Sequence, residues 1–164
     1  MFSVLAYGYA LAEIGHVKNY GAVLTIGLAL GLAVAASAEE DKWQTDFKKA
    51  QQEAKANNKL LLVDFTGSDW CGWCIKLNRE VFSQPEFKEY ASKNLILLAI
   101  DFPRRKEQSV ALKKQNVQMA EEYQIQGFPT IIVLNGDGRK IGELSYMEGG
   151  PTAFITELEK LRKS

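Results

Sequence analysis

Residues 64–74, with the sequence DFTGSDWCGWC, contain both cysteines of the chain and decide how the rest of it is interpreted. Cys71 and Cys74 are separated by two residues, and each of them directly follows a tryptophan. The stretch begins at the end of a short apolar run, passes through the polar turn TGSD and leads into residues that fit a helix. Such a pair can be half of a metal site, a structural cross-link or a reactive dithiol.

The segments around this pair alternate between helical and strand-like patterns. Apolar residues at helical spacing begin at Trp43, after a cap-like Asp41 that is followed three residues on by Gln44, and predict a helix to about Asn57. Strands are predicted at 59–65, 95–100, 130–134 and 140–145, and further helices at 75–82 with a restart near Pro85, between 109 and 123, and at 154–161. The turn NGDG at 135–138 joins the last two strands as a hairpin. This order predicts an α/β fold, with a central mixed β-sheet flanked by helices on both faces.

The composition fits one globular domain and excludes some classes of partner. The chain has 164 residues, of which 46% are hydrophobic and 24% are charged, so it is neither disordered nor large enough for several domains. Its 20 basic and 20 acidic residues balance. No broad field therefore favours nucleic acid or anionic lipid, and we expect no nucleic-acid partner.

The first 38 residues differ from the rest. Residues 21–38, GAVLTIGLALGLAVAASA, carry no charge, end in Ala-Ser-Ala and are followed at once by acidic residues. This pattern is typical of a secretory signal, so we predict cleavage after Ala38, a domain at 39–164, and a periplasmic or secreted protein. An uncleaved membrane anchor formed by residues 21–38 is the alternative. Residues 1–16 lack a positive charge, and we hypothesise that Val17 is the true initiator.

A metal site and a structural cross-link both explain the cysteine pair poorly. A closed zinc site needs four ligands, usually Cys or His, and removal of residues 1–38 removes His16, the only histidine. We therefore expect no metal. A disulfide that closes a loop of two residues restricts the unfolded chain very little. A domain of this length can also bury a core without such a cross-link.

A reactive dithiol explains the spacing. At the start of a helix, free N–H groups and the helix dipole favour a thiolate at Cys71, which would be the nucleophile. Cys74, one turn further on, could then attack the mixed disulfide and release the partner. The two cysteines carry both electrons in such a reaction, so no organic cofactor is expected.

The combination of motifs resembles the thioredoxin superfamily, and most of all its exported bacterial thioredoxin-like proteins. The motifs are Asp64 near the end of a strand, WCGWC at 70–74 opening a helix, and GFPT at 127–130 before a later strand. The resemblance covers about residues 43–161. It implies a thioredoxin fold and protein-disulfide oxidoreductase activity.

The resemblance also implies roles for residues outside the cysteine pair. Pro129 would be the family's cis-proline beside the reactive disulfide, leaving the backbone of Phe128 open to strand-like pairing with substrate; a trans turn is the alternative. Asp64 would be the buried acid beneath Cys74, with a pKa raised by desolvation, and would accept the proton of that thiol. The turn before Cys71 is longer than in thioredoxins proper, which leaves a displaced Asp64 with a capping or solvated role as the alternative.

The aromatic residues predict a surface for polypeptides. Trp70 is expected both at the edge of the core and at the rim of the site, next to Gly72 and Trp73. Trp73 lies between the cysteines, so we expect it to be partly exposed and to contact substrate, although a packing role is the simpler alternative. Together with Phe128 it would form an apolar rim. The basic run at 104–106 is expected to be a solvated loop.

One residue between the cysteines bears on the direction of the reaction. In this superfamily a histidine between the cysteines often accompanies oxidase or isomerase activity, and Trp73 stands there instead. We therefore expect a reductase of protein disulfides, kept reduced by a membrane electron donor, because an exported compartment would otherwise leave it oxidised. The alternatives are an oxidase or isomerase, and a thioredoxin-like binding or chaperone module in which redox chemistry is secondary.

Overall fold

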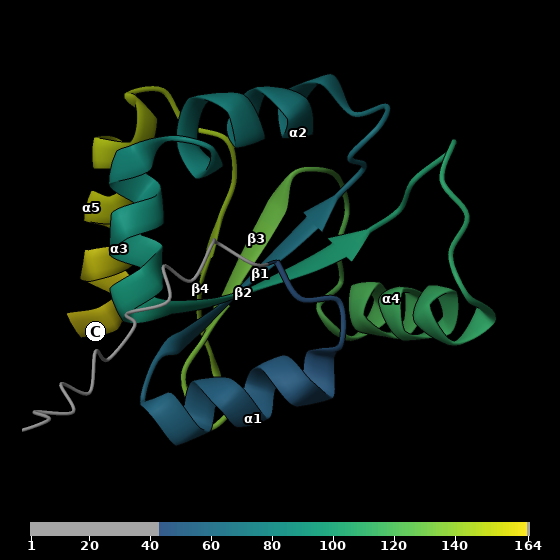
Figure 1. The fold of residues 1–164 in the computed structure, drawn as a ribbon, viewed down its shortest axis with the longest axis horizontal. Coiled ribbons are helices and arrows are strands. Elements are labelled where there is room, and N and C mark those ends of the chain that lie inside the picture. Colours follow the sequence, from purple (N-terminus) through teal and green to yellow (C-terminus); the bar gives the residue numbers. More distant parts are fainter. Residues whose placement is uncertain (1–42, 164) are drawn as a thin grey trace, which may run out of the picture. The chain divides into compact units, whose positions relative to one another are not determined.

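The computed structural model describes residues 43–163, and the predicted signal segment at 1–38 lies outside them. At its centre is a four-stranded mixed sheet with the order β2-β1-β3-β4 (Figure 1). The strands are β1 (Leu60–Thr66), β2 (Leu95–Asp101), β3 (Thr130–Leu134) and β4 (Lys140–Leu144). β1 pairs parallel with β2 and antiparallel with β3, and β3 pairs antiparallel with β4, so the predicted mixed sheet and hairpin are confirmed.

Helices cover both faces of this sheet, as predicted. They are α1 (Phe47–Asn57), α2 (Gly72–Leu77), the π-helical turn η1 (Asn78–Phe82), α3 (Pro85–Asn94), α4 (Val110–Glu122) and α5 (Gly150–Lys163). Successive residues of β1 point to opposite faces because a strand has a period of two. Leu62 packs with side chains from η1, α3 and α5, whereas its neighbours Leu61 and Val63 pack with α1 and α4.

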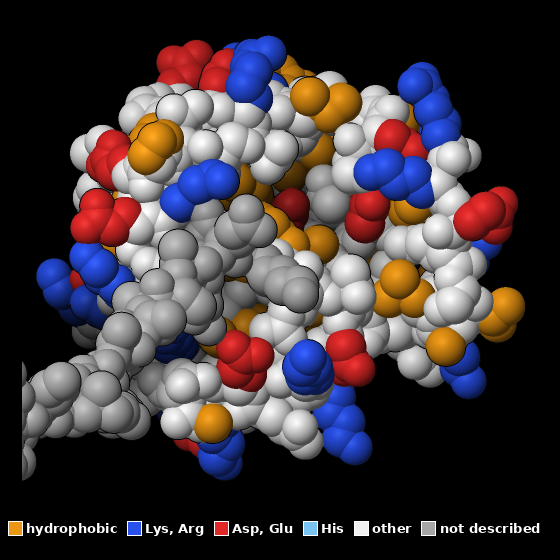
Figure 2. All heavy atoms as spheres, in the orientation of Figure 1, with side chains coloured by type: hydrophobic (Ala, Val, Ile, Leu, Met, Phe, Trp, Pro, Cys, Tyr) orange, Lys and Arg blue, Asp and Glu red, His pale blue; other side chains and the backbone are white. Residues whose placement is uncertain are grey.

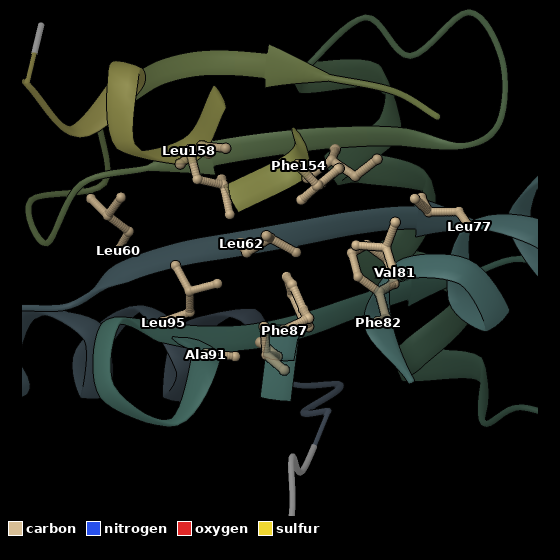
Figure 3. Close-up of a cluster of buried hydrophobic side chains, with 13 residues drawn as sticks. Leu60, Leu62, Leu77, Val81, Phe82, Phe87, Ala91, Leu95, Phe154 and Leu158 are labelled. Atoms are coloured by element: carbon tan, nitrogen blue, oxygen red, sulfur yellow. The ribbon is translucent and has the colours of Figure 1, made fainter. Parts of the chain in front are cut away.

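The face under α3 and α5 holds a group of aromatic rings (Figure 3). The ring centroids of Phe82 and Phe87 lie 5.0 Å apart, and those of Phe82 and Phe154 lie 5.6 Å apart. All three side chains are buried. Because these rings come from η1, α3 and α5, they join the end of the cysteine-bearing helix to the core.

The predicted start of the first helix is wrong. Asp41 lies outside the described residues, but Gln44 runs beside β2 instead of joining a helix. Its N–H donates to the carbonyl of Leu97 and its carbonyl accepts from the N–H of Ala99, both at 2.9 Å. β2 is an edge strand, and its unpaired backbone groups take up this segment. The helix begins at Phe47, where the side chain of Asp46 accepts from the N–H of Lys49 at 3.0 Å.

The predicted break after the cysteine-bearing helix is confirmed, but the residues before the break form a π-helical turn. α2 continues into η1, one turn with the wider hydrogen-bonding of a π-helix. α3 then begins with Pro85 in its first turn, where the missing N–H has no consequence. Gln84 is the cap residue and makes no side-chain hydrogen bond to the helix. None of the helices between residues 43 and 163 is long and apolar enough to cross a bilayer.

Candidate active site

The two cysteines form a disulfide at the start of α2, so the structure is that of the oxidised protein. Cys71 is the cap residue of the helix, and its Sγ accepts a hydrogen bond from the N–H of Cys74 at 3.2 Å. Both residues are buried, with 7% of Cys71 and 4% of Cys74 exposed. After reduction the same N–H would face a Cys71 thiolate, and a donor in that position lowers a thiol pKa. The geometry therefore favours Cys71 as the nucleophile.

Asp64 lies inside β1, a strand whose seven residues are all buried. Burial, and to a smaller extent the charge of Asp101, raise the pKa of Asp64 to about 7. Its Oδ1 is buried without a hydrogen-bond partner. By strand alternation the side chain lies on the face that carries Leu62, which α3, α5 and η1 cover. The predicted burial and raised pKa are confirmed, whereas proton transfer to Asp64 stays a prediction.

The peptide bond between Phe128 and Pro129 is cis. Pro129 is buried immediately before β3, and its carbonyl accepts a hydrogen bond from Ser145 Oγ at 2.8 Å. The ring of Phe128 stacks on that of Phe102 with centroids 5.3 Å apart, and meets the ring of Trp70 edge-on at 6.0 Å. Trp70 directly precedes Cys71, so these contacts bring the segment before β3 to the cysteine loop.

The long turn before Cys71 is fixed to the end of β2. Ser68 donates twice to the Asp101 carboxylate, from its N–H at 2.9 Å and from Oγ at 2.6 Å. The indole Nε1 of Trp70 donates to the carbonyl of Phe102 at 2.7 Å. A Cβ at Gly67 would lie 2.5 Å from the Trp70 ring, so the turn needs a glycine there.

A second set of bonds ties the same turn to the basic run. The Asp69 carboxylate accepts from the N–H of Arg104 at 3.0 Å and from that of Arg105 at 2.7 Å. These backbone bonds hold the pKa of Asp69 below its usual value. The guanidinium of Arg104 lies 3.9 Å from the centroid of the Trp70 ring. The side chains at 104–106 are exposed, as expected of a solvated loop, but their backbone is anchored to the cysteine loop.

Trp73 is 57% exposed, in agreement with its predicted exposure. Its ring centroid lies 5.2 Å from that of Tyr146, and the Nζ of Lys76 lies 5.1 Å from the first ring and 4.7 Å from the second. Tyr146 donates its hydroxyl to Glu80 at 2.8 Å. Trp73 and Phe128 thus belong to two aromatic groups with different partners, and their joint role as a rim for substrate stays a prediction. Gly72 is exposed between the cysteines, and a Cβ there would meet no atom within 4 Å.

Three residues that the sequence did not predict contact predicted site residues: Tyr146 and Lys76 lie against Trp73, and Phe102 lies against Phe128. Asp101, also not predicted, acts on Asp64 through its charge. Tyr146 and Phe102 come from segments that follow β4 and β2, and no local pattern marks them as neighbours of the cysteine loop. Across residues 43–163, no group of three or more His, Cys, Asp or Glu side chains is arranged to hold a metal ion.

A cysteine pair at a helix start and a cis-proline before the next antiparallel strand, on a β2-β1-β3-β4 sheet, define a thioredoxin-fold dithiol protein. The family model described as a thioredoxin-like domain matches residues 47–162, and the chain belongs to this family. It is a thioredoxin-like protein-disulfide oxidoreductase.

Individual relatives agree with this assignment. The chain is 28% identical over 122 residues to the disulfide bond reductase DsbH of Chlamydia pneumoniae, covering 74% of this chain and 73% of that protein. It is 29% identical over 129 residues to the thioredoxin-related protein DsbJ of the same organism, covering 76% of this chain but only 37% of DsbJ. A solved structure of a DsbH oxidoreductase superposes with a TM-score of 0.71 at 28% identity, covering 74% of this chain and 84% of that chain.

Proposed function

We propose that this protein reduces disulfide bonds in exported proteins. The observation that carries the proposal is the disulfide between Cys71 and Cys74 at the start of α2, with the exposed Trp73 and no histidine between them. Without a cationic neighbour inside the pair, the Cys71 thiolate is stabilised less than in strong oxidants, and the disulfide form is correspondingly favoured. The similarity to a protein named as a disulfide bond reductase supports the same direction.

The reaction begins with the reduced protein. The Cys71 thiolate attacks one sulfur of a substrate disulfide, an S–S bond forms to Cys71, and the other substrate sulfur leaves as a thiolate that takes up a proton. Cys74 then loses its proton and attacks the Cys71 sulfur, which forms the disulfide of this structure and releases the second substrate thiol. The substrate gains two electrons and two protons, and the protein loses them.

Asp64 is proposed as the acceptor of the Cys74 proton. A base is most effective when its pKa lies near the operating pH, and burial raises the pKa of Asp64 to about 7. Its unpartnered Oδ1 is free to receive a hydrogen bond from a thiol or from a bridging water. Trp70, Gly72, Trp73, Phe128 and Pro129 are proposed to contact the polypeptide around its disulfide.

The place of action and the partners are part of this proposal. Export by residues 1–38 with cleavage after Ala38 would put the domain in the periplasm or outside the cell, and anchoring by residues 21–38 would hold it at the membrane surface. In either place the surroundings favour disulfides. Repeated turnover therefore needs a thiol donor, which we place in the membrane, and the cysteines carry both electrons without an organic cofactor.

The reduction potential of the pair tests the direction. Equilibration of the protein against glutathione and dithiothreitol buffers, with the Cys71 pKa measured alongside, should give a value near that of thioredoxin, about −270 mV. A value above about −180 mV, with an acidic Cys71, would assign an oxidase or isomerase instead.

Two variants separate the enzyme from a binding module. Cys74→Ser should accumulate a mixed disulfide between Cys71 and its substrates, because the resolving thiol is missing. Replacing both cysteines by serine should abolish activity in cells. Full activity of the double variant in cells would mean that binding, and not exchange, is the function.

A further inference from the structure

A shallow apolar hollow lies between the end of α4 and the segment that leads to Pro129. It has a volume of about 510 Å³ and is lined by Phe102, Val117, Ala120, Glu121, Gln124, Ile125 and Gln126. Phe102, Ala120 and Ile125 are half-buried and form its apolar part, together with Val117, which is 48% exposed. Figure 2 shows hydrophobic side chains at the surface in the region of α4. We call this feature the α4 hollow.

The α4 hollow is continuous with the active site. Phe102 lines the hollow and also stacks on Phe128, with ring centroids 5.3 Å apart and the ring planes 26° apart. Phe128 in turn meets Trp70, the residue before Cys71. The Trp70 Nε1 bond to the Phe102 carbonyl fixes the two ends of this aromatic row to each other. Three half-buried rings in contact therefore connect the residue before Cys71 to the hollow.

The walls of the hollow suit a polypeptide better than a small molecule. Val117, Glu121, Gln124 and Gln126 are exposed, so a ligand would stay open to water, whereas small-molecule sites enclose most of their ligand. The rim carries amide groups and a carboxylate, which can pair with peptide N–H and C=O groups. The base is apolar, so covering it with another apolar group removes that surface from water and is favourable.

We propose that the α4 hollow binds an apolar side chain of the substrate polypeptide, at a position along its chain away from the reacting cysteine. This rests on the proposed function, because it assumes that the substrate of Cys71 is a polypeptide. The hollow would select among disulfides by the residues near them, while exchange itself stays with Cys71 and Cys74.

Peptide–glutathione mixed disulfides test the proposal with the full chain in its reduced form. One series carries a single Leu at successive positions on either side of the cysteine, and the matched series carries Ser. At one position or a few adjacent ones, the second-order rate constant for the Leu peptide should exceed that for the Ser peptide by about tenfold, as expected for an apolar side chain entering an apolar site. Equal rates, within twofold, at every position would overturn the proposal.

Two valines of the same helix supply the variant and its control. Val117→Asp should lower the rate for the preferred Leu peptide by about tenfold and leave the Ser peptides and glutathione disulfide unchanged. Val117→Ser should act in the same direction with a loss of about threefold. Val110, which is 84% exposed and does not line the hollow, gives the matched control Val110→Asp, with no expected loss. Equal losses in the two Asp variants would contradict the proposal.

The direction of exchange does not affect this test. If the protein oxidises peptide dithiols instead of reducing disulfides, the reductase proposal fails, but the preference for Leu should persist in the oxidising direction. If the preference is absent while reduction proceeds, the hollow has no part in binding and the proposed function stands.

Discussion

The Asp64 carboxyl group inside β1 has a raised pKa, and its effect on stability can be measured. The other residues of the strand are apolar except for Thr66, and Asp64 has no partner for its Oδ1. A charge in such a place has lost its hydration, so the protonated form is favoured in the folded protein. The negative charge of Asp101 also raises the pKa of Asp64, because it disfavours a second negative charge.

The free energy of unfolding of the oxidised protein should therefore fall as the pH rises from about 4 to about 7. Asp64 has a pKa of about 7 when folded and an ordinary value of 3.8 when unfolded, so the folded state holds its proton longer. The loss should amount to about 4 kcal/mol, be absent below the unfolded value and be complete above the folded one. Urea unfolding at a series of pH values measures it.

Asp64→Asn should remove this contribution. The variant should match the wild type near pH 4 and be more stable than it by several kcal/mol near pH 8, while reducing substrates more slowly because the proton acceptor is gone. Glu143→Gln is the control, because Glu143 is an exposed carboxylate paired with Lys140 at the surface. A pH profile of Asp64→Asn that parallels the wild type would show that the residue is solvated.

At the scale of elements, the longer turn before Cys71 acts as a clamp on the segment that follows β2. Asp69 binds the N–H groups of Arg104 and Arg105, and Ser68 binds Asp101. The clamp keeps Phe102 in place, and Phe102 supports Phe128. A turn one residue shorter, as in thioredoxins proper, would lack part of this set of donors and acceptors.

Asp69→Ala should loosen this clamp without unfolding the domain. The amides of Arg104 and Arg105 lose their acceptor, and their protection from hydrogen exchange should drop by about tenfold, while amides in β1 keep theirs. Exchange followed by NMR measures both at once. Asp137→Ala, which removes an exposed ion pair with Lys55, is the control and should leave Arg104 and Arg105 unchanged. Unchanged protection in Asp69→Ala would mean that the segment is held by other contacts.

The sequence predicted where the helices and strands lie along the chain better than which segments meet in the fold. Short apolar runs identified the three buried strands to within one residue at either end, and the NGDG turn identified the partly exposed β4 as the partner of β3. The helix start predicted at Asp41 was wrong because Asp46 has the same capping carboxylate and is the residue that caps the helix. Gln44 instead pairs with the free edge of β2. The cysteine pair was predictable from its spacing. Tyr146 and Phe102 were not, because only the folded sheet brings their segments to the site.

At the scale of the whole molecule, β1, β2 and β3 each contribute side chains to both apolar layers. β1 pairs with both β2 and β3, and alternate side chains of β1 enter the layer under α3 and α5 and the layer under α1 and α4. The order of the strands could not be predicted from the sequence, since long-range pairing decides it. Because the same strands supply side chains to both layers, we expect disruption of one layer to destabilise the other.

Large-to-small substitutions in either layer should therefore destabilise the whole domain. Phe154→Ala, under α5, should lower the free energy of unfolding by about 3–5 kcal/mol, and Leu134→Ala, in the opposite layer, by about 2–5 kcal/mol. Tryptophan fluorescence reports mainly on the first layer and the active site, and far-UV circular dichroism reports on all elements. In both variants the two signals should change with one common midpoint in urea. Two separate midpoints would show that the layers unfold independently, and that β1 does not couple the cysteine helix to the rest of the fold.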